Sequence, residues 1–274
     1  MTKSRYPAFP YILFMIIFIV VPLFMVAYFA FTTRTGAFTF QNIIRVGEYI
    51  PVIIKSLYMA FVATVICIGL GYPFAYIMAK KTSNIRRTMF MLIMLPMWMN
   101  FLLRTYSWMT ILENNGLLNR LFGLFGIGPF EMINTQGAVI LGMVYDYLPF
   151  MIVPLYTVMM KMDRSLIQAA QDLGANPLQV FLHVTLPQTM PGISTGITMV
   201  FIPSVSTFII SKMPGGGSEL MIGDLIEMQF SSNSYNPNLG SAISFILMII
   251  ILVCMSILNQ FDSDKVEEEG RMVV

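Results

Sequence analysis

Long apolar runs separated by short polar segments dominate the hydropathy pattern of this chain. A helix needs about 20 predominantly apolar residues to cross the hydrocarbon core of a bilayer. Six runs of about that length or more cover Pro10–Thr33, Val52–Ala79, Met89–Leu112, Gly137–Met160, Pro191–Ser211 and Ser241–Asn259. The pattern predicts an all-α membrane protein with about six transmembrane helices, folded as a single domain over residues 1–274.

The composition supports the same assignment. Hydrophobic residues make up 57% of the 274 positions and charged residues only 11%, with a mean hydropathy of +0.74. A soluble domain carries about a quarter charged residues, so a soluble enzyme or binding module is excluded. The first run follows Lys3 and Arg5 but is longer than the core of a cleaved signal peptide, so we expect it to remain as the first helix. Cys67 and Cys254 lie inside apolar runs without a second ligand type beside them, and no metal site is predicted.

The placement of lysine and arginine sets the expected orientation. With the N-terminus inside, ten of these residues fall in cytoplasmic segments and five in outer segments, which is the asymmetry of the positive-inside rule. The compact turn Lys80–Arg87 contributes most to it. The sequence therefore predicts both termini in the cytoplasm, a solvated acidic tail at 260–274, and outer segments at 34–51, 113–136 and 212–240.

The segment 161–190 is the one long loop on the predicted cytoplasmic side. Asp163 is suited to cap the start of a helix, and Gly174 suits the left-handed residue that ends one. Asn176 provides a second cap, with Pro177 at the first helical position, where a missing N–H group is harmless. We expect two short helices joined by a tight turn. Such a rigid protrusion can act as a lever on a transmembrane bundle.

The second helix of this loop is expected to end at Leu186-Pro187, with Pro191 opening the fifth span. The loop contains Gln168-Ala169-Ala170, then Gly174 after three residues, then Val184-Thr185-Leu186-Pro187 after nine. This resembles the EAA loop of ABC importer permeases, in which glutamate and isoleucine stand where this chain has Gln168 and Val184. In that family the loop docks into a groove of the ATPase subunit and transmits its motion. The resemblance assigns the ATPase contact to Gln168, Ala169, Ala170, Asp172, Gly174, Ala175, Leu186 and Pro187.

The chain has no G-x-x-x-x-G-K-[ST] phosphate loop. ATP and its Mg²⁺ are therefore expected on a separate ATPase subunit, with no cofactor and no catalytic residue in this chain. The single histidine, His183, lies in the loop without a nucleophile or a metal cluster around it. An intramembrane enzyme is therefore a poor interpretation.

Further segments resemble the spermidine/putrescine permeases among these importers. The similarity extends from about Tyr49 to Asn259 and is carried by Pro96-Met97-Trp98-Met99-Asn100, Leu103-Arg104-Thr105-Tyr106, Tyr147–Tyr156 and Leu220–Ile226. It implies the type I (MetI-like) permease fold with cytoplasmic coupling helices, a bacterial inner-membrane location, and polyamines as the solute. It also implies a second, similar permease, a pair of ATPases, and an extracytoplasmic polyamine-binding protein as partners.

Asp146 is the only acidic residue deep in a predicted span, and an intramembrane carboxylate is a functional candidate. It is flanked by Tyr145 and Tyr147. Arg104 of the preceding span lies at a matching depth, about 12–14 Å below the outer surface at 1.5 Å per residue. Two interpretations are open and can coexist. Asp146 forms a structural ion pair with Arg104, or it contacts the ammonium groups of the solute.

A polar stripe is also predicted on the third helix, because Pro96, Asn100, Arg104 and Trp108 recur every four residues. Such a stripe should face protein or a cavity rather than lipid. The hydroxyls of the fifth span near Pro203 are either solute ligands or helix-packing contacts. The candidate solute path therefore comprises Asp146, Tyr145, Tyr147, Trp98, Asn100, Arg104, Trp108 and Ser204.

The outer segment 212–240 predicts a short helix over Leu220–Phe230 and raises one difficulty. The chain has Ser211-Lys212 where related permeases commonly place an acid. A lysine there repels polyammonium unless it faces away from the solute or pairs with Glu219 or with a partner subunit. One alternative is therefore an importer permease for another small solute, such as an anion met by Arg104. A second alternative is a transporter driven by an ion gradient, although no internal repeat supports it.

Overall fold

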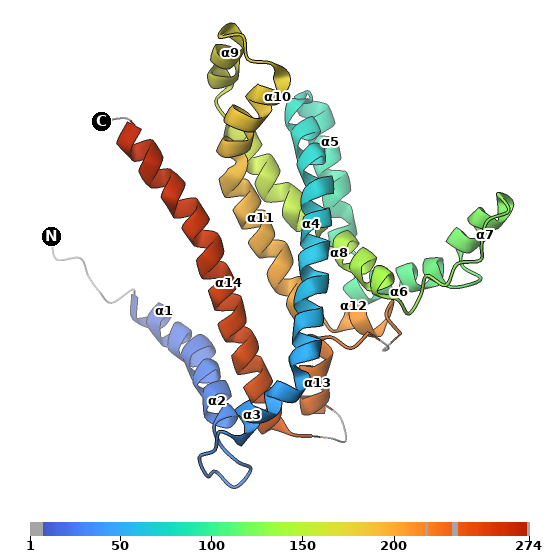
Figure 1. Ribbon diagram of the computed structural model, residues 1–274, viewed down its shortest axis with the longest axis vertical. Coiled ribbons are helices and arrows are strands. Elements are labelled where there is room, and N and C mark those ends of the chain that lie inside the picture. Colours follow the sequence, from blue (N-terminus) through green and yellow to red (C-terminus); the bar gives the residue numbers. More distant parts are fainter. Residues whose placement is uncertain (1–7, 217–218, 232–234, 273–274) are drawn as a thin grey trace.

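The computed structural model describes residues 8–216, 219–231 and 235–272, which are helical almost throughout (Figure 1). The elements follow along the chain as α1 (Ala8–Met15), the π-helical η1 (Ile16–Val20), α2 (Val21–Ala30), α3 (Gln41–Val46), the 3₁₀ turn η2 (Gly47–Tyr49), α4 (Ile50–Lys80), α5 (Ser83–Met94), the 3₁₀ turn η3 (Leu95–Trp98), α6 (Phe101–Leu112), α7 (Leu117–Leu124), α8 (Gln136–Lys161), α9 (Arg164–Asp172), α10 (Pro177–Val180), the π-helical η4 (Phe181–Thr185), α11 (Leu186–Ser206), α12 (Ile209–Lys212), α13 (Ile222–Ser231) and α14 (Pro237–Met272). The predicted all-α architecture is confirmed.

The centre of the molecule consists of α4, α8 and α11, with α8 packed against both of the others (Figure 1). Fully buried side chains such as Met59, Met143, Met151 and Leu155 fill this contact. A second apolar cluster joins α14 to α2, α3 and α13. The chain is therefore a three-helix core with a second group of helices packed along one side.

Glycines allow the three central helices to approach one another closely. A Cβ atom added to Gly196 of α11 would lie 2.6 Å from Sδ of Met151, and one added to Gly71 of α4 would lie 3.0 Å from Cγ of the same residue. A Cβ on Gly192 would lie 3.1 Å from the carbonyl oxygen of Pro154. Small residues at helix crossings are typical of membrane bundles, where close van der Waals packing holds helices together.

By length and composition, four helices in the described part of the chain can cross a membrane, and they cover Pro10–Ala30, Gln41–Lys80, Gln136–Lys161 and Pro237–Leu258. A bent pair of helices adds a fifth if it counts as one span. The predicted run Pro191–Ser211 corresponds to α11, which starts earlier and ends earlier than predicted. It is absent from these four because threonine, serine, glycine and proline occur along its whole length.

The predicted third span, Met89–Leu112, is not one straight helix. The chain bends by 94° between Ser83–Trp98 and Phe101–Leu124. Asn100 sits at the break with an extended ψ of 129°, and its side chain accepts hydrogen bonds from the first backbone N–H groups of α6. An asparagine in this position starts a new helix instead of continuing the old one.

This break corrects the predicted polar stripe. Pro96 lies in the turn before the bend, Asn100 caps the helix after it, and only Arg104 and Trp108 lie on α6. The four-residue spacing describes one face only in a continuous helix. The stripe prediction was therefore wrong, because it assumed a helix that Asn100 interrupts.

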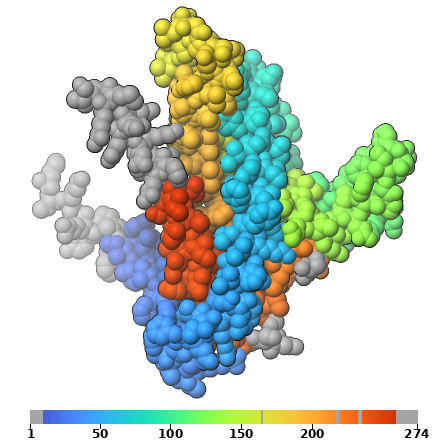
Figure 2. Space-filling view, viewed as in Figure 1, coloured from blue at the N-terminus to red at the C-terminus, as the bar shows by residue number. Residues whose placement is uncertain are grey.

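The loop 161–190, with α9 and α10, projects from one end of the bundle, and α3 and α13 lie at the opposite end (Figure 1). A second projection, formed by α6 and α7, extends sideways (Figure 2). The predicted acidic tail, 260–274, continues α14 as helix to Met272. Its side chains lie outside the described residues, as do residues 1–7 with Lys3 and Arg5.

Candidate coupling loop and transport path

The loop 161–190 begins with a capped helix, as predicted. The backbone N–H of Ser165 donates to Oδ1 of Asp163 at 2.8 Å, and this contact lowers the pKa of the Asp163 carboxyl. The helix ends at Asp172 with Leu173 as its C-terminal cap, and Gly174 follows with a φ of +83°. A residue with a Cβ atom adopts this left-handed conformation only with strain, which explains the glycine. The first helix of the loop and its two end signals are therefore confirmed.

The second helix starts as predicted but does not end as predicted. Asn176 and Gln179 form a reciprocal capping box, with both hydrogen bonds at 2.9 Å, and Pro177 occupies the first turn. The helix then continues through the π-helical turn Phe181–Thr185 directly into α11. Leu186-Pro187 therefore lies inside a continuous helical rod rather than at its end.

The π-helical turn explains why Pro187 does not break the rod. Proline lacks an N–H group, and its ring displaces the carbonyl one turn earlier. A wider i→i+5 turn next to it absorbs this local change without ending the helix. The loop is thus joined to the centre of the bundle by one uninterrupted helix over residues 177–206.

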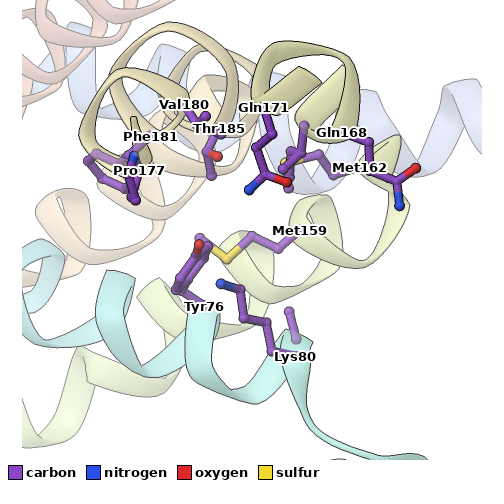
Figure 3. A pocket seen from close by; sticks show the side chains of 12 residues that line it. Tyr76, Lys80, Met159, Met162, Gln168, Gln171, Pro177, Val180, Phe181 and Thr185 are labelled. Atoms are coloured by element: carbon purple, nitrogen blue, oxygen red, sulfur yellow. The ribbon is translucent and has the colours of Figure 1, made fainter. Parts of the chain in front are cut away.

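A cavity of about 540 Å³ lies at the base of the loop, where the ends of α4 and α8 meet α9 and α10 (Figure 3). Its wall includes Gln168, the position at which the EAA pattern has glutamate. Nζ of Lys80, another wall residue, lies 4.0 Å from the centre of the Tyr76 ring in a cation–π contact. Both helices of the loop therefore face the ends of α4 and α8 across open space, and the rod joins the loop to the bundle.

Exposed leucines cover the protruding loop, and the sequence analysis missed them. Leu173 is 89% exposed, and three further leucines are exposed around it, namely Leu166, Leu178 and Leu182. Ala169, Asp172 and Pro187 are exposed as well, whereas Ala170, Ala175 and Leu186 are half-buried. Apolar side chains gathered on a protrusion are typical of a protein–protein contact. The signal was present as leucines in a loop that no predicted span includes.

Inside the bundle, Arg104 of α6 and Asp146 of α8 are in contact. Nε of Arg104 lies 2.6 Å from Oδ1 of Asp146, and the two side chains are 10% and 3% exposed. The same guanidinium donates through Nη1 to the carbonyl oxygen of Pro96 at 2.9 Å. The structure therefore brings together the two charges whose depths match in the sequence. The bond to Pro96 also ties α6 back to the turn before the bend.

Aromatic rings surround part of this ion pair. Tyr145 packs edge-on against Trp108 with ring centres 5.1 Å apart, and the guanidinium carbon of Arg104 lies 5.8 Å from the Tyr145 ring. The hydroxyl of Tyr147 instead donates to the carbonyl oxygen of Pro203 at 3.4 Å, which joins α8 to α11. Four candidate path residues therefore form one cluster: Arg104, Trp108, Tyr145 and Asp146.

Three other candidates do not join this cluster. Trp98 is 83% exposed at the bend, and Asn100 is committed to capping α6. Ser204 is fully buried, and its hydroxyl donates to the carbonyl oxygen of Val200 at 2.7 Å within its own helix. Its hydroxyl therefore bonds to the backbone of its own helix.

Comparison with known proteins assigns the family. Residues 68–265 match the family described as the binding-protein-dependent transport system inner membrane component. The chain belongs to this family. It is 38% identical over 247 residues to the spermidine/putrescine transport system permease protein PotB of Escherichia coli (strain K12), covering 86% of this chain and 90% of that protein.

Other comparisons agree with the permease assignment. The PotB protein of Haemophilus influenzae is 38% identical over an alignment of 268 residues that covers 93% of this chain and 93% of that protein. Among solved structures, a bacterial ABC transporter that imports the acidic polysaccharide alginate superposes with a TM-score of 0.78 over 93% of each chain, at 15% identity. That likeness shows the fold. The chain is thus a multi-pass membrane permease of an ABC importer.

The end of the permease opposite the loop carries two further ion pairs. Lys55 of α4 pairs with Glu219, and Nζ of Lys212 lies 2.5 Å from Oε2 of Glu227 on α13. Of the pairings open for Lys212 in the sequence, the one with Glu219 is not formed, because Lys55 already holds that carboxylate and Lys212 pairs with Glu227. The predicted short helix over Leu220–Phe230 is confirmed as α13.

Proposed function

We propose that this permease forms half of the translocation pathway for spermidine and putrescine. The observation that carries the proposal is the 38% identity to two PotB proteins over 86% and 93% of this chain. The partners would be a second permease of the PotC type, an ATPase dimer of the PotA type that binds ATP and Mg²⁺, and an extracytoplasmic polyamine-binding protein of the PotD type. The chain itself would contribute no catalytic residue.

The proposed orientation places both termini and the loop 161–190 in the cytoplasm, with α13 on the extracytoplasmic side. The excess of lysine and arginine on the loop side supports this orientation. The exposed leucines around Leu173 would then dock against the ATPase, since burying a leucine side chain contributes about 1.5–3 kcal/mol. Gln168, Ala169 and Asp172 belong to the same docking segment.

Motion of the ATPase would reach the bundle through the rod over residues 177–206. A helix held at one end by a capping box and packed at the other against α8 transmits a push along its length. The open cavity under α9 and α10 leaves the loop room to shift relative to the ends of α4 and α8. We propose the α10–α11 rod as the coupling element of the permease.

The Arg104–Asp146 cluster would take part in the solute path. A buried ion pair is neutral overall, and an ammonium group that approaches Asp146 would share the carboxylate with Arg104. The faces of Tyr145 and Trp108 offer cation–π contacts at the same place. The second permease would supply the remaining side chains, since this cluster holds one carboxylate for a solute with two or more ammonium groups.

Uptake of radiolabelled spermidine into vesicles tests the proposal. The permease, its partner subunits and the binding protein are reconstituted with ATP enclosed on the ATPase side. We expect ATP-dependent uptake that excess putrescine or spermidine suppresses. Uptake that neither polyamine suppresses would contradict the polyamine assignment and favour another solute, whereas uptake without the ATPase would indicate an ion-coupled transporter.

A further inference from the structure

Two acidic residues share one face of α13 with a single lysine beside them. Asp224 and Glu227 are three residues apart in the helix and therefore neighbours on its surface. Lys212, at the end of α12, pairs with Glu227 at 2.5 Å and is also the cation that acts on Asp224. The site holds two carboxylates against one resident ammonium group.

One carboxylate oxygen of this site lacks a partner. Asp224 is 2% exposed, and its Oδ2 accepts a hydrogen bond from the backbone N–H of Met221 at 2.9 Å. Its Oδ1 is buried with no hydrogen-bond donor in the described part of the chain. The hydroxyl of Ser211 lies close enough to act on this carboxylate, but its hydrogen bond goes to the carbonyl oxygen of Phe208 at 2.9 Å. A buried polar atom without a partner costs free energy and indicates a group that a further ligand can satisfy.

The resident ion pair is suited to exchange. The side chains of Lys212 and Glu227 are 44% and 31% exposed, so water and small cations reach them. An exposed ion pair contributes only about 0–1 kcal/mol. A lysine side chain presents a primary ammonium group at the end of a four-carbon alkyl chain. Each end of a linear alkyl diamine presents the same group. If an ammonium group of a diamine replaces that of Lys212, the contact with Glu227 therefore keeps the same chemistry.

We propose that the α12–α13 corner is a binding site for a linear diamine, and that Lys212 occupies it as a tethered substitute until the diamine arrives. One ammonium group of the ligand displaces Lys212 from Glu227, and the other lies against Asp224. A monoamine supplies only one of these charges, so the site selects against it. This inference rests on the proposed polyamine function. It also gives a role to Lys212, which from the sequence alone would only repel a polyamine.

The corner is held in place for this role. The backbone N–H of Ile222, the first residue of α13, donates to Oγ of Ser56 on α4 at 2.8 Å. The ion pair between Lys55 and Glu219 fixes the chain just before that helix. Because that pair includes neither Asp224 nor Glu227, it anchors the corner without belonging to the site. It therefore supplies a matched control.

The test measures binding of radiolabelled putrescine by equilibrium dialysis at low ionic strength, with the assembled permease and ATPase complex in nanodiscs and no binding protein. We expect Lys212→Met to bind putrescine about two- to fivefold more tightly than wild type, the factor that corresponds to losing a competing exposed ion pair. Glu227→Gln and Asp224→Asn should weaken binding. Lys212→Arg and the control Lys55→Met should match wild type.

Butylamine serves as the matched monoamine in the same assay. It should compete poorly against putrescine in every variant. The proposal would be overturned if Lys212→Met bound putrescine no more tightly than wild type. It would also be overturned if butylamine competed as well as unlabelled putrescine. Retention of the partner subunits checks assembly, and Lys212→Arg shows whether substitution alone perturbs the corner. Either of these outcomes would refute the diamine site. The polyamine function would still stand if wild type takes up spermidine in vesicles.

Discussion

The two ends of the permease are stabilised by different kinds of contact. The loop end depends on neighbours in sequence: Asp163 caps its own helix, Asn176 and Gln179 cap the next, and Gly174 makes the turn between them. The α13 end depends on distant partners, such as Ile222 bonded to Ser56. The loop can therefore move as a unit without losing its shape. The opposite end keeps its shape only while α4, α12 and α13 stay together.

The difference indicates a division of labour. A self-contained knob with exposed leucines suits mechanical contact with a motor subunit. The α13 end is held by apolar contacts with α14, by the buried hydrogen bond from Ile222 to Ser56 and by two ion pairs partly open to solvent, so it keeps its place only as part of the bundle. The Arg104–Asp146 pair lies between the two ends and is buried, so it belongs to neither pattern.

Removing the carboxylate that pairs with the buried Arg104 should have the largest effect. Asp146→Asn leaves Arg104 buried without its carboxylate, and breaking a buried ion pair costs about 3–5 kcal/mol. We expect loss of transport and a low yield of assembled complex on size-exclusion chromatography. Combining it with Arg104→Gln should restore part of the assembly but not the transport. A double variant that assembles no better than the single one would show that the pair is not a structural unit.

Replacing Leu173, the exposed leucine at the tip of the loop, should have the second-largest effect. Leu173→Ser should weaken binding of the ATPase by about one to two orders of magnitude, because it removes about 1.5–3 kcal/mol of apolar contact. Titration of labelled ATPase onto permease in nanodiscs measures this. Leu124→Ser on α7, where the leucine is equally exposed, is the matched control and should leave ATPase binding unchanged. Equal weakening by both variants would count against the loop as the docking surface.

The turn between the loop helices should respond less strongly. Gly174→Val forces a branched side chain into the left-handed region at a cost of about 1–2 kcal/mol. Coupled uptake should fall roughly tenfold while the core of the permease stays folded. Gly36→Val is the control, since Gly36 has a φ of +85° at the opposite end and likewise no neighbour near its Cβ position. Its variant should keep the ratio of uptake to ATP hydrolysis, and a change in that ratio would argue against a loop-specific effect.

The smallest effect is expected at the α13 end. Ser56→Ala removes the acceptor for the N–H of Ile222, a hydrogen bond of about 1 kcal/mol. Hydrogen exchange in α13 should speed up by about fivefold while exchange in α9 stays constant. Faster exchange at both ends, or at neither, would mean that the two ends are not stabilised independently.

The sequence predicted those features that depend on local signals. The caps at Asp163 and Asn176 and the turn at Gly174 are determined by residues within a few positions, so they were found. The bend at Asn100 was missed because an apolar run with suitable period hides a cap in its middle. The sequence predicts a helix end at Leu186-Pro187 because proline usually breaks a helix, and no residue pattern marks the π-helical turn that accommodates it.

For contacts between distant residues, the sequence narrows the choice of partners but does not determine it. Matching depth in adjacent spans brought out Arg104 and Asp146 as a pair, since helix geometry converts residue number into height. No such rule chose between Glu219 and Glu227 as the partner of Lys212. That choice depends on how α4 reaches the outer loop, where Lys55 already occupies Glu219.

The continuous rod over residues 177–206 is the central element of this account, and one distance measures it directly. Spin labels at Leu178 and Met199, both exposed, would lie about 32 Å apart at 1.5 Å per residue. Double electron–electron resonance on the assembled complex should give the same distance with and without trapped ATP, while the distance from Leu178 to an exposed site on α4, Tyr58, changes. A change within the rod would show that it hinges at the π-helical turn, and the loop could then not act as a lever on the bundle.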